Sequence, residues 1–232
     1  MLESDLQPAT APTTIFLKDY QKPDFLIPIT NLDFQLGETH TRVTAVLQLH
    51  RNGKHTRSLV LDGEKMELIS LKIDGKKLED SEYQVADESL TIGSVPDSFE
   101  LEIVTQLQPH LNTELSGLYQ SSGNFCTQCE AEGFRRITFF PDRPDVLSVY
   151  TATLTASAKD CPVLLSNGNL DSSGETTEGR HWAKWHDPHP KPSYLFALVA
   201  GDLEHINGHF VTASGAPVEL NIYTQAHNID KC

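Results

Sequence analysis

Hydrophobic and polar residues alternate along several stretches of the chain, which is the pattern of half-buried β-strands. These stretches lie within residues 29–36, 43–50, 69–73, 99–103 and 149–155. No segment carries a sustained apolar stripe with the spacing of an α-helix. The pattern therefore predicts an all-β chain, folded as a large antiparallel β-sandwich or a saddle-shaped sheet.

Short turn signals separate the predicted strands. Dipeptides that favour tight hairpin turns occur at Asn52-Gly53, Asp62-Gly63, Asp74-Gly75, Asn167-Gly168 and Asn207-Gly208. Their close spacing is typical of a sheet whose neighbouring strands are joined by hairpins.

Three segments depart from this pattern. Residues 110–133 are rich in Ser, Gly, Asn and Gln, and we expect a long ordered loop of the kind that carries function. Residues 186–192 contain three prolines, which lack backbone donors, so this segment is not expected in a central strand. The continuous apolar run at 194–200 predicts a strand that is buried on both faces.

A new hairpin pattern begins after Gly201 and continues to Cys232, where nothing resembles a natural domain end. We expect residues 1–201 to form one β domain. Residues 202–232 are expected to be the first strands of a second, truncated domain.

Composition limits the classes of function. The chain has 32 Asp and Glu against 18 Lys and Arg, a formal charge of −14, which disfavours binding to nucleic-acid phosphates. No apolar run approaches the roughly 18 residues that span a bilayer, and no secretory signal is visible at the start. Four cysteines are too few for a disulfide scaffold. We expect a cytoplasmic protein without nucleic-acid or membrane partners.

The histidines do not predict a metal site. His205 and His209 have the spacing of two zinc ligands on a helix, but an Asn-Gly turn signal lies between them and no Glu follows either His. His181, His186 and His189 are close in sequence, yet no regular element is predicted that would bring them together on one metal. We expect them in a solvated loop, and we assign no metal ligand in this chain.

Two further motifs suggest alternative functions. Cys126 and Cys129 form a Cys-x-x-Cys pair, which would define a redox or metal module if it opened a helix. In an all-β context we expect two small residues in a tight loop. Trp182 and Trp185 would suit a free-standing β-sandwich module that binds carbohydrate or peptide, although residues three apart on a strand face opposite sides.

Charged residues are dense around Phe139-Phe140-Pro141. They are Arg135, Arg136, Asp142, Arg143 and Asp145. We interpret this group as a buried ion-pair brace between a loop and the sheet.

Gln128 and Glu130 form a Gln-x-Glu pair whose side chains point the same way in an extended loop. Glu130 can accept a charge-assisted hydrogen bond from a substrate ammonium group, and Gln128 can accept another through its amide oxygen. From the residues alone the signal is weak, because exposed Gln and Glu side chains on loops are usually only solvated.

Residues 128–145 resemble the N-terminal domain of the bacterial aminopeptidase N family of zinc-dependent aminopeptidases. The segment contains the Gln-x-Glu pair at 128–130, Arg-Arg at 135–136 and Asp-Arg-Pro-Asp at 142–145. Residues 117–123, 165–169 and 191–202 are also similar to family segments, in the same order.

The resemblance implies an N-terminal fragment of an enzyme that removes N-terminal amino acids from peptides. Residues 202–232 would then begin a thermolysin-like catalytic domain, and the zinc ligands of the full-length enzyme would lie outside this fragment. The family assigns Gln128 and Glu130 to the binding of the substrate's free amine. The implied partners are the peptide N-terminus and the downstream catalytic domain, no catalytic residue lies in the fragment, and the fragment alone is expected to be inactive. The alternative is a stand-alone β-sandwich module that binds a ligand without catalysis.

Overall fold

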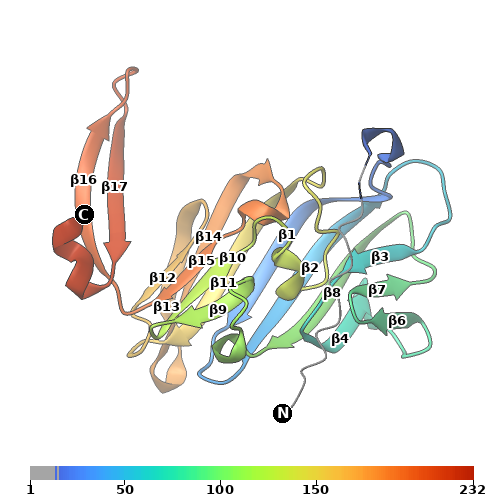
Figure 1. Ribbon diagram of the computed structural model, residues 1–232, viewed down its shortest axis with the longest axis horizontal. Helices are drawn as coiled ribbons and strands as arrows, with labels where there is room; N and C mark the ends of the chain where they lie inside the picture. The colour runs from blue at the N-terminus through green and yellow to red at the C-terminus, as the bar shows by residue number, and fades with distance from the viewer. Residues whose placement is uncertain (1–13, 15) are drawn as a thin grey trace, which may run out of the picture.

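The structure is a computed structural model that describes residue 14 and residues 16–232. The described chain consists of strands joined by loops and short 3-10 turns (Figure 1). The strands are β1 (Phe25–Gln35), β2 (Thr41–Arg51), β3 (Leu59–Asp62), β4 (Glu67–Ile73), β5 (Lys76–Lys77), β6 (Tyr83–Ala86), β7 (Ser89–Ile92), β8 (Ser98–Leu107), β9 (Gly117–Ser121), β10 (Asn124–Gln128), β11 (Ser148–Ser157), β12 (Val163–Ser166), β13 (Asn169–Glu175), β14 (Arg180–Lys191), β15 (Leu198–Gly201), β16 (Glu204–Val211) and β17 (Pro217–Thr224). The 3-10 turns are η1 (Leu17–Asp19), η2 (Pro109–Leu111), η3 (Phe134–Arg136), η4 (Thr177–Gly179), η5 (Ser193–Leu195) and η6 (Ala226–Lys231). No helix in this part of the chain has the length and apolar composition needed to cross a membrane.

The strands form four sheets. The largest has eight strands in the order β13-β14-β11-β1-β2-β8-β4-β5, and a four-stranded sheet has the order β12-β15-β10-β9. A three-stranded sheet, β3-β7-β6, and a hairpin, β16-β17, complete the fold. The predicted all-β architecture is confirmed. One feature was not predicted: β1 and β11 pair in parallel at the centre of the large sheet.

The core lies between the large sheet and the two smaller sheets. Val43, Ala45, Leu47 and Leu49 on β2 are fully buried, as their alternation predicts. They belong to one continuous cluster with apolar side chains of β3, β7, β10, β12 and β15. The cluster therefore joins the eight-, four- and three-stranded sheets into one body.

Two predicted strands are interrupted by β-bulges, which shift side chains off the expected face. A register shift between Leu68 and Ser70 leaves Ile69 39% exposed, so of the alternating apolar residues on β4 only Leu71 is buried. A second shift lies between Leu26 and Ile29 in β1, and Ile29 is likewise on the exposed side.

The expectation of a long loop at 110–133 is wrong in part, because the segment contains the hairpin β9-β10. Its turn residues Ser122 and Gly123 have φ angles of 51° and 83°, as a tight two-residue turn requires. The alternation is hidden because much of the hairpin is polar.

The expectation that the prolines of 186–192 avoid a central strand is confirmed, whereas the expectation for 194–200 needs correction. β14 includes Pro188 and Pro190, but its pairing with β13 stops at His186, so the prolines lie where β14 is an edge strand. The run 194–200 is not one buried strand. It begins with the 3-10 turn η5, and Leu195 is exposed.

The turn signals have mixed outcomes. Asp74-Gly75 joins β4 to β5 with both φ angles positive, as predicted. Asp62-Gly63 ends β3 without forming a hairpin, and Asn167-Gly168 connects strands of different sheets. Asn207-Gly208 lies inside β16, and the turn of that hairpin falls at 212–216, where Gly215 has a positive φ.

The hairpin β16-β17 stands apart from the sheets of the body (Figure 1). Most of its side chains are exposed, including the apolar residues Phe210, Leu220 and Ile222. The chain after Gly201 therefore adds little to the core of the preceding sheets.

Two leucine substitutions test the position of the core. Leu47→Ala removes a fully buried side chain from β2, so we expect the free energy of unfolding to fall by about 2–5 kcal/mol. Leu170→Ala, on the edge strand β13 where the side chain is 52% exposed, should cost less than about 1 kcal/mol. Urea unfolding followed by circular dichroism measures both. Equal losses would contradict the proposed core.

Candidate functional site

Gln128 and Glu130 lie at the point where the chain leaves β10. Gln128 is the last residue of the strand and pairs with Gly117 of β9. Between the two polar residues, Cys129 is buried in the core, whereas both Gln128 and Glu130 are exposed. The structure therefore presents this amide and this carboxylate on the outer side of one short segment.

The contacts of the pair define which atoms face outward. The Gln128 amide nitrogen donates a hydrogen bond to the backbone oxygen of Glu130, at 3.2 Å. This bond uses the donor side of the amide and leaves its carbonyl oxygen available as an acceptor. Within the described part of the chain, the Glu130 carboxylate has no hydrogen bond or ion pair, while its neighbour Glu132 pairs with Arg135 at 3.4 Å.

Residues 129–133, here called the anchor turn, form one tight reversal of the chain. The Gly133 N–H donates to the carbonyl of Cys129 at 2.9 Å. A Cβ at Gly133 would lie 2.3 Å from the backbone oxygen of Gln128 and 2.9 Å from the backbone nitrogen of Gly117. The close packing of these backbones fits only glycine at position 133, and it fixes the anchor turn against β9. Sequence inspection passed over this glycine, because only long-range contacts show its role.

The charged group after the anchor turn is a brace, as predicted. Arg135 pairs with the buried Asp142 at 3.2 Å, and Arg136 pairs with Glu64 at 3.0 Å and also with Glu114. These contacts tie η3 to the loop between β3 and β4, to the loop before β9 and to the segment that follows η3.

Arg143 and Asp145 form a separate pair of the same group, at 2.6 Å. The hydrogen bond from Arg143 holds the pKa of the Asp145 carboxyl below its usual value. Tyr20 donates a further hydrogen bond to Asp145 at 2.8 Å, so this pair fastens the N-terminal segment to the body.

The cysteine pair does not have the environment of a redox site. Cys126 lies on β10 and Cys129 in the anchor turn, and neither opens a helix. Burial raises the pKa of both thiols, and the nearby Asp142 charge adds to the effect on Cys129. A reactive thiolate needs the opposite shift, so the redox alternative is not supported.

The tryptophans do not form one stacking platform. Trp185 packs against the core and donates to the Leu164 carbonyl at 3.1 Å, whereas Trp182 covers Gly174 of the neighbouring strand. Because the two positions differ by an odd number on β14, they lie on opposite faces of the sheet.

The histidines singled out in the sequence lie on two strands, and His181, His186 and His189 are part of β14 and not of the expected solvated loop. His181 and His186 lie on opposite faces of β14, where they bond to the Cys161 carbonyl and to Thr151. His205 and His209 lie on β16, at strand spacing rather than on one helical face. Across residue 14 and residues 16–232, no three His, Cys, Asp or Glu side chains come together as a metal site.

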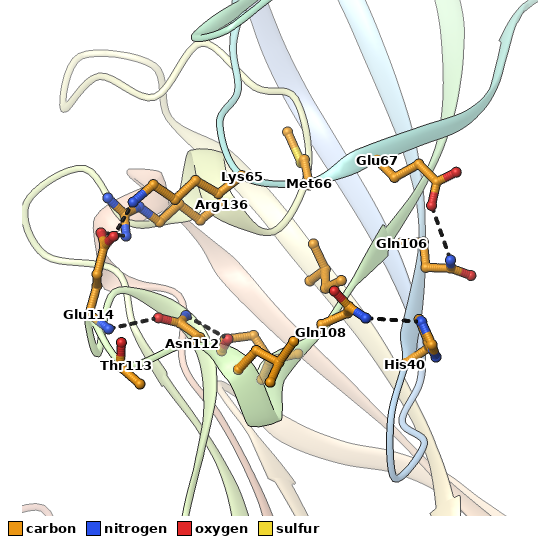
Figure 2. A pocket seen from close by; sticks show the side chains of 13 residues that line it. His40, Lys65, Met66, Glu67, Gln106, Gln108, Asn112, Thr113, Glu114 and Arg136 are labelled. Atoms are coloured by element: carbon orange, nitrogen blue, oxygen red, sulfur yellow. Dashed lines mark hydrogen bonds and ion pairs between the residues drawn. The ribbon is translucent and has the colours of Figure 1, made fainter.

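A well-formed cleft lies beside the brace and not at the Gln-x-Glu pair. It has a volume of about 430 Å³ and is lined by residues of β4, β8, η2, β9 and η3. Figure 2 shows Lys65 and Arg136 on one side, both directed at Glu114. On the other side Gln106 lies beside Glu67, and Gln108 lies beside His40. These polar groups bond to one another or to nearby residues, including Gln106 to Glu67 at 3.1 Å. The cleft therefore offers paired charges and is not lined by Gln128 or Glu130.

Comparison with known proteins identifies the family. The sequence profile of the Peptidase M1 N-terminal domain matches residues 28–195. Aminopeptidase N of Haemophilus influenzae is 49% identical over 219 residues, which span 93% of this chain and 25% of that protein. Aminopeptidase N of Escherichia coli is 44% identical over 220 residues, which span 95% and 25%.

Solved structures agree with the sequence comparison. The crystal structure of Legionella pneumophila aminopeptidase A in complex with aspartic acid superposes with a TM-score of 0.88 at 37% identity, over 93% of this chain and 26% of that chain. An M1 zinc metallopeptidase from Deinococcus radiodurans has a TM-score of 0.74 over 88% of this chain and 48% of that chain; at 17% identity it shows only the shared fold.

The chain belongs to the Peptidase M1 N-terminal domain family, which confirms the resemblance found in its motifs. It spans about a quarter of the length of the aminopeptidase N relatives that it matches.

A glycine substitution tests the anchor turn. We expect Gly133→Ala to lower the free energy of unfolding by about 1–3 kcal/mol, because the new methyl group meets backbone atoms that must move. Gly93→Ala is the matched control, since nothing lies within 4 Å of its Cβ position, and it should change stability by less than about 0.5 kcal/mol. Urea unfolding of both variants gives the comparison. If Gly133→Ala is as stable as the control, the anchor turn has more room than the structure shows.

Proposed function

We propose that this chain is the N-terminal domain of a cytoplasmic zinc aminopeptidase and that Gln128 and Glu130 bind the free amine of its peptide substrate. The family membership and the quarter-length coverage of the aminopeptidase N relatives support the first part. The second part rests on one observation: an exposed carboxylate without a partner among the described residues lies beside an amide whose oxygen is available as an acceptor.

The chemistry of the pair suits recognition of an α-ammonium group. A carboxylate and an amide oxygen are acceptors only, and an ammonium group carries three N–H donors. An internal peptide bond offers one neutral N–H at the same place, so it gains much less from the carboxylate. An enzyme that must choose chain ends can obtain this selectivity from Glu130.

Amine binding also has a positioning role in this proposal. When the α-ammonium group is held at Glu130 and Gln128, the first peptide bond of the substrate lies at a fixed distance from the anchor turn. Fixing that distance selects which bond reacts, and it reduces the entropy lost on the way to the transition state.

No three His, Cys, Asp or Glu side chains of the described residues come together as a metal site, and the closely spaced histidines lie along the strands β14 and β16. We therefore place zinc binding and the hydrolytic step in the catalytic domain of the longer protein. We further propose that this domain begins with residues 202–232. The separate hairpin β16-β17 and the end of the family match at residue 195 support this boundary.

A charge-removing substitution tests the amine site in the full-length enzyme. We expect Glu130→Gln to lower kcat/KM for an aminoacyl p-nitroanilide by about 10- to 150-fold, because a charge-assisted hydrogen bond contributes about 1.5–3 kcal/mol. Glu88→Gln is the control, since this exposed carboxylate lies in the turn between β6 and β7, away from the anchor turn, and should leave kcat/KM unchanged. Steady-state kinetics measure both. Unchanged kinetics in Glu130→Gln would remove the basis for the proposal.

The 232-residue chain alone provides a second test. We expect it to bind no stoichiometric zinc and to hydrolyse no aminoacyl p-nitroanilide, because we place the metal ligands in the longer protein. Elemental analysis of the purified chain measures zinc, and an absorbance assay measures hydrolysis. Chelator-sensitive activity in a preparation that contains only this chain would show that a metal site exists within it.

A further inference from the structure

Asp142 is a buried carboxylate behind the anchor turn. Its side chain is 1% exposed, and both of its oxygens accept hydrogen bonds. One oxygen accepts from the hydroxyl of Ser193 in η5. The other accepts from the backbone N–H of Arg135 at 3.1 Å and from the Arg135 Nε at 3.2 Å.

The backbone of Asp142 makes two more connections. Its N–H donates to the carboxylate of Asp62 at 2.9 Å, and its carbonyl accepts from the Arg135 Nη2 at 3.1 Å. Asp142 therefore joins three segments that are far apart in the sequence: the end of β3, η3 and η5. A buried charge with this many donors is well compensated, and removal of the charge leaves the donors without partners.

These contacts lead directly to the anchor turn. Arg135 is two residues after Gly133, whose N–H closes the turn, and its guanidinium also pairs with Glu132 inside the turn. Cys129, at the start of the turn, is held by its burial in the core. Asp142 therefore supports the end of the anchor turn that leads into η3, and it does so through Arg135.

We propose that Asp142 is a positioning residue for substrate-amine recognition: through Arg135 it fixes the anchor turn, and the turn fixes Gln128 and Glu130. The proposal rests on the amine-binding function proposed above. Asp142 is buried and does not touch the substrate, so its effect must pass through the placement of Glu130. A displacement of about 1 Å in such a group can reduce catalysis by about a hundredfold.

Two substitutions separate the contacts of Asp142. Asp142→Asn keeps the volume but removes the negative charge that compensates the Arg135 guanidinium. Arg135→Lys keeps the positive charge but loses the planar fork that bonds to the Asp142 side chain and carbonyl together.

The experiment uses the full-length enzyme and measures recognition of the amine itself. The probe is the ratio of two inhibition constants, for an amino-acid amide and for the same amide without its amino group. The ratio does not depend on how much of the enzyme is active, so a partly unfolded variant with an intact site leaves it unchanged. We expect Asp142→Asn and Arg135→Lys each to reduce the preference for the free amine by about tenfold or more, with a matching rise in KM.

A double mutant tests whether Asp142 acts through Glu130. If it does, adding Asp142→Asn to Glu130→Gln should reduce the preference no further, because the recognising charge is already absent. An additional loss in the double mutant overturns the proposed route. If Asp142→Asn does not yield folded enzyme, Arg135→Lys replaces it, alone and combined with Glu130→Gln. The same ratio of inhibition constants then supports or overturns the proposed route.

The two proposals can fail separately. If the ratio of inhibition constants is unchanged in Glu130→Gln, amine binding by the pair is rejected. The positioning role of Asp142 is then rejected as well. A reduced ratio in Glu130→Gln together with an unchanged ratio in Asp142→Asn and Arg135→Lys retains amine binding and rejects only the positioning role.

Discussion

The parallel pairing of β1 with β11 is the constraint on which the rest of the structure depends. It places Thr30 beside Ser148, whose buried hydroxyls bond at 2.7 Å, and so joins two halves of the chain that are more than a hundred residues apart. Parallel neighbours cannot be joined by a hairpin and require a long crossover. Here the crossover contains β9, β10 and the anchor turn, so the central pairing fixes both ends of the segment that carries Gln128 and Glu130.

Within that crossover, exposed polar groups are held by buried contacts. Gln128 and Glu130 face outward, while the intervening Cys129 is in the core and Gly133 packs against neighbouring backbone. Apart from the hydrogen bond from the Gln128 amide nitrogen to the Glu130 backbone, these buried neighbours hold the pair in place, and its acceptor atoms remain available. In our proposal Asp142 also supports the anchor turn, because its bonds to Arg135 and to Ser193 resist movement of the turn. A rigid support behind a solvated pair is what ligand positioning requires.

The sequence predicts those parts of the fold that depend on local pattern. The alternation along 43–49 identifies a buried strand, and the positive-φ turn at Asp74-Gly75 is visible as a dipeptide. Bulges, such as the one beside Ile69, depend on pairing with a partner strand, so alternation alone misplaces that residue. The candidate site likewise has a part that is visible in the sequence and a part that depends on distant contacts. Gln128 and Glu130 were found by resemblance to a family motif. The support from Ser193 was not, because it meets Asp142 across 51 positions in the chain.

The exposure of Glu130 has a consequence for how the amine site works. A carboxylate and an ammonium group in contact at the protein surface contribute only about 0–1 kcal/mol, because water screens the charges. The same contact is worth several times more when one side of it is closed off from water, since the effective dielectric constant falls. In our proposal the longer protein supplies that covering surface and this chain supplies the oriented acceptors. Strong recognition of the substrate amine then requires both, which links amine binding to assembly of the complete site.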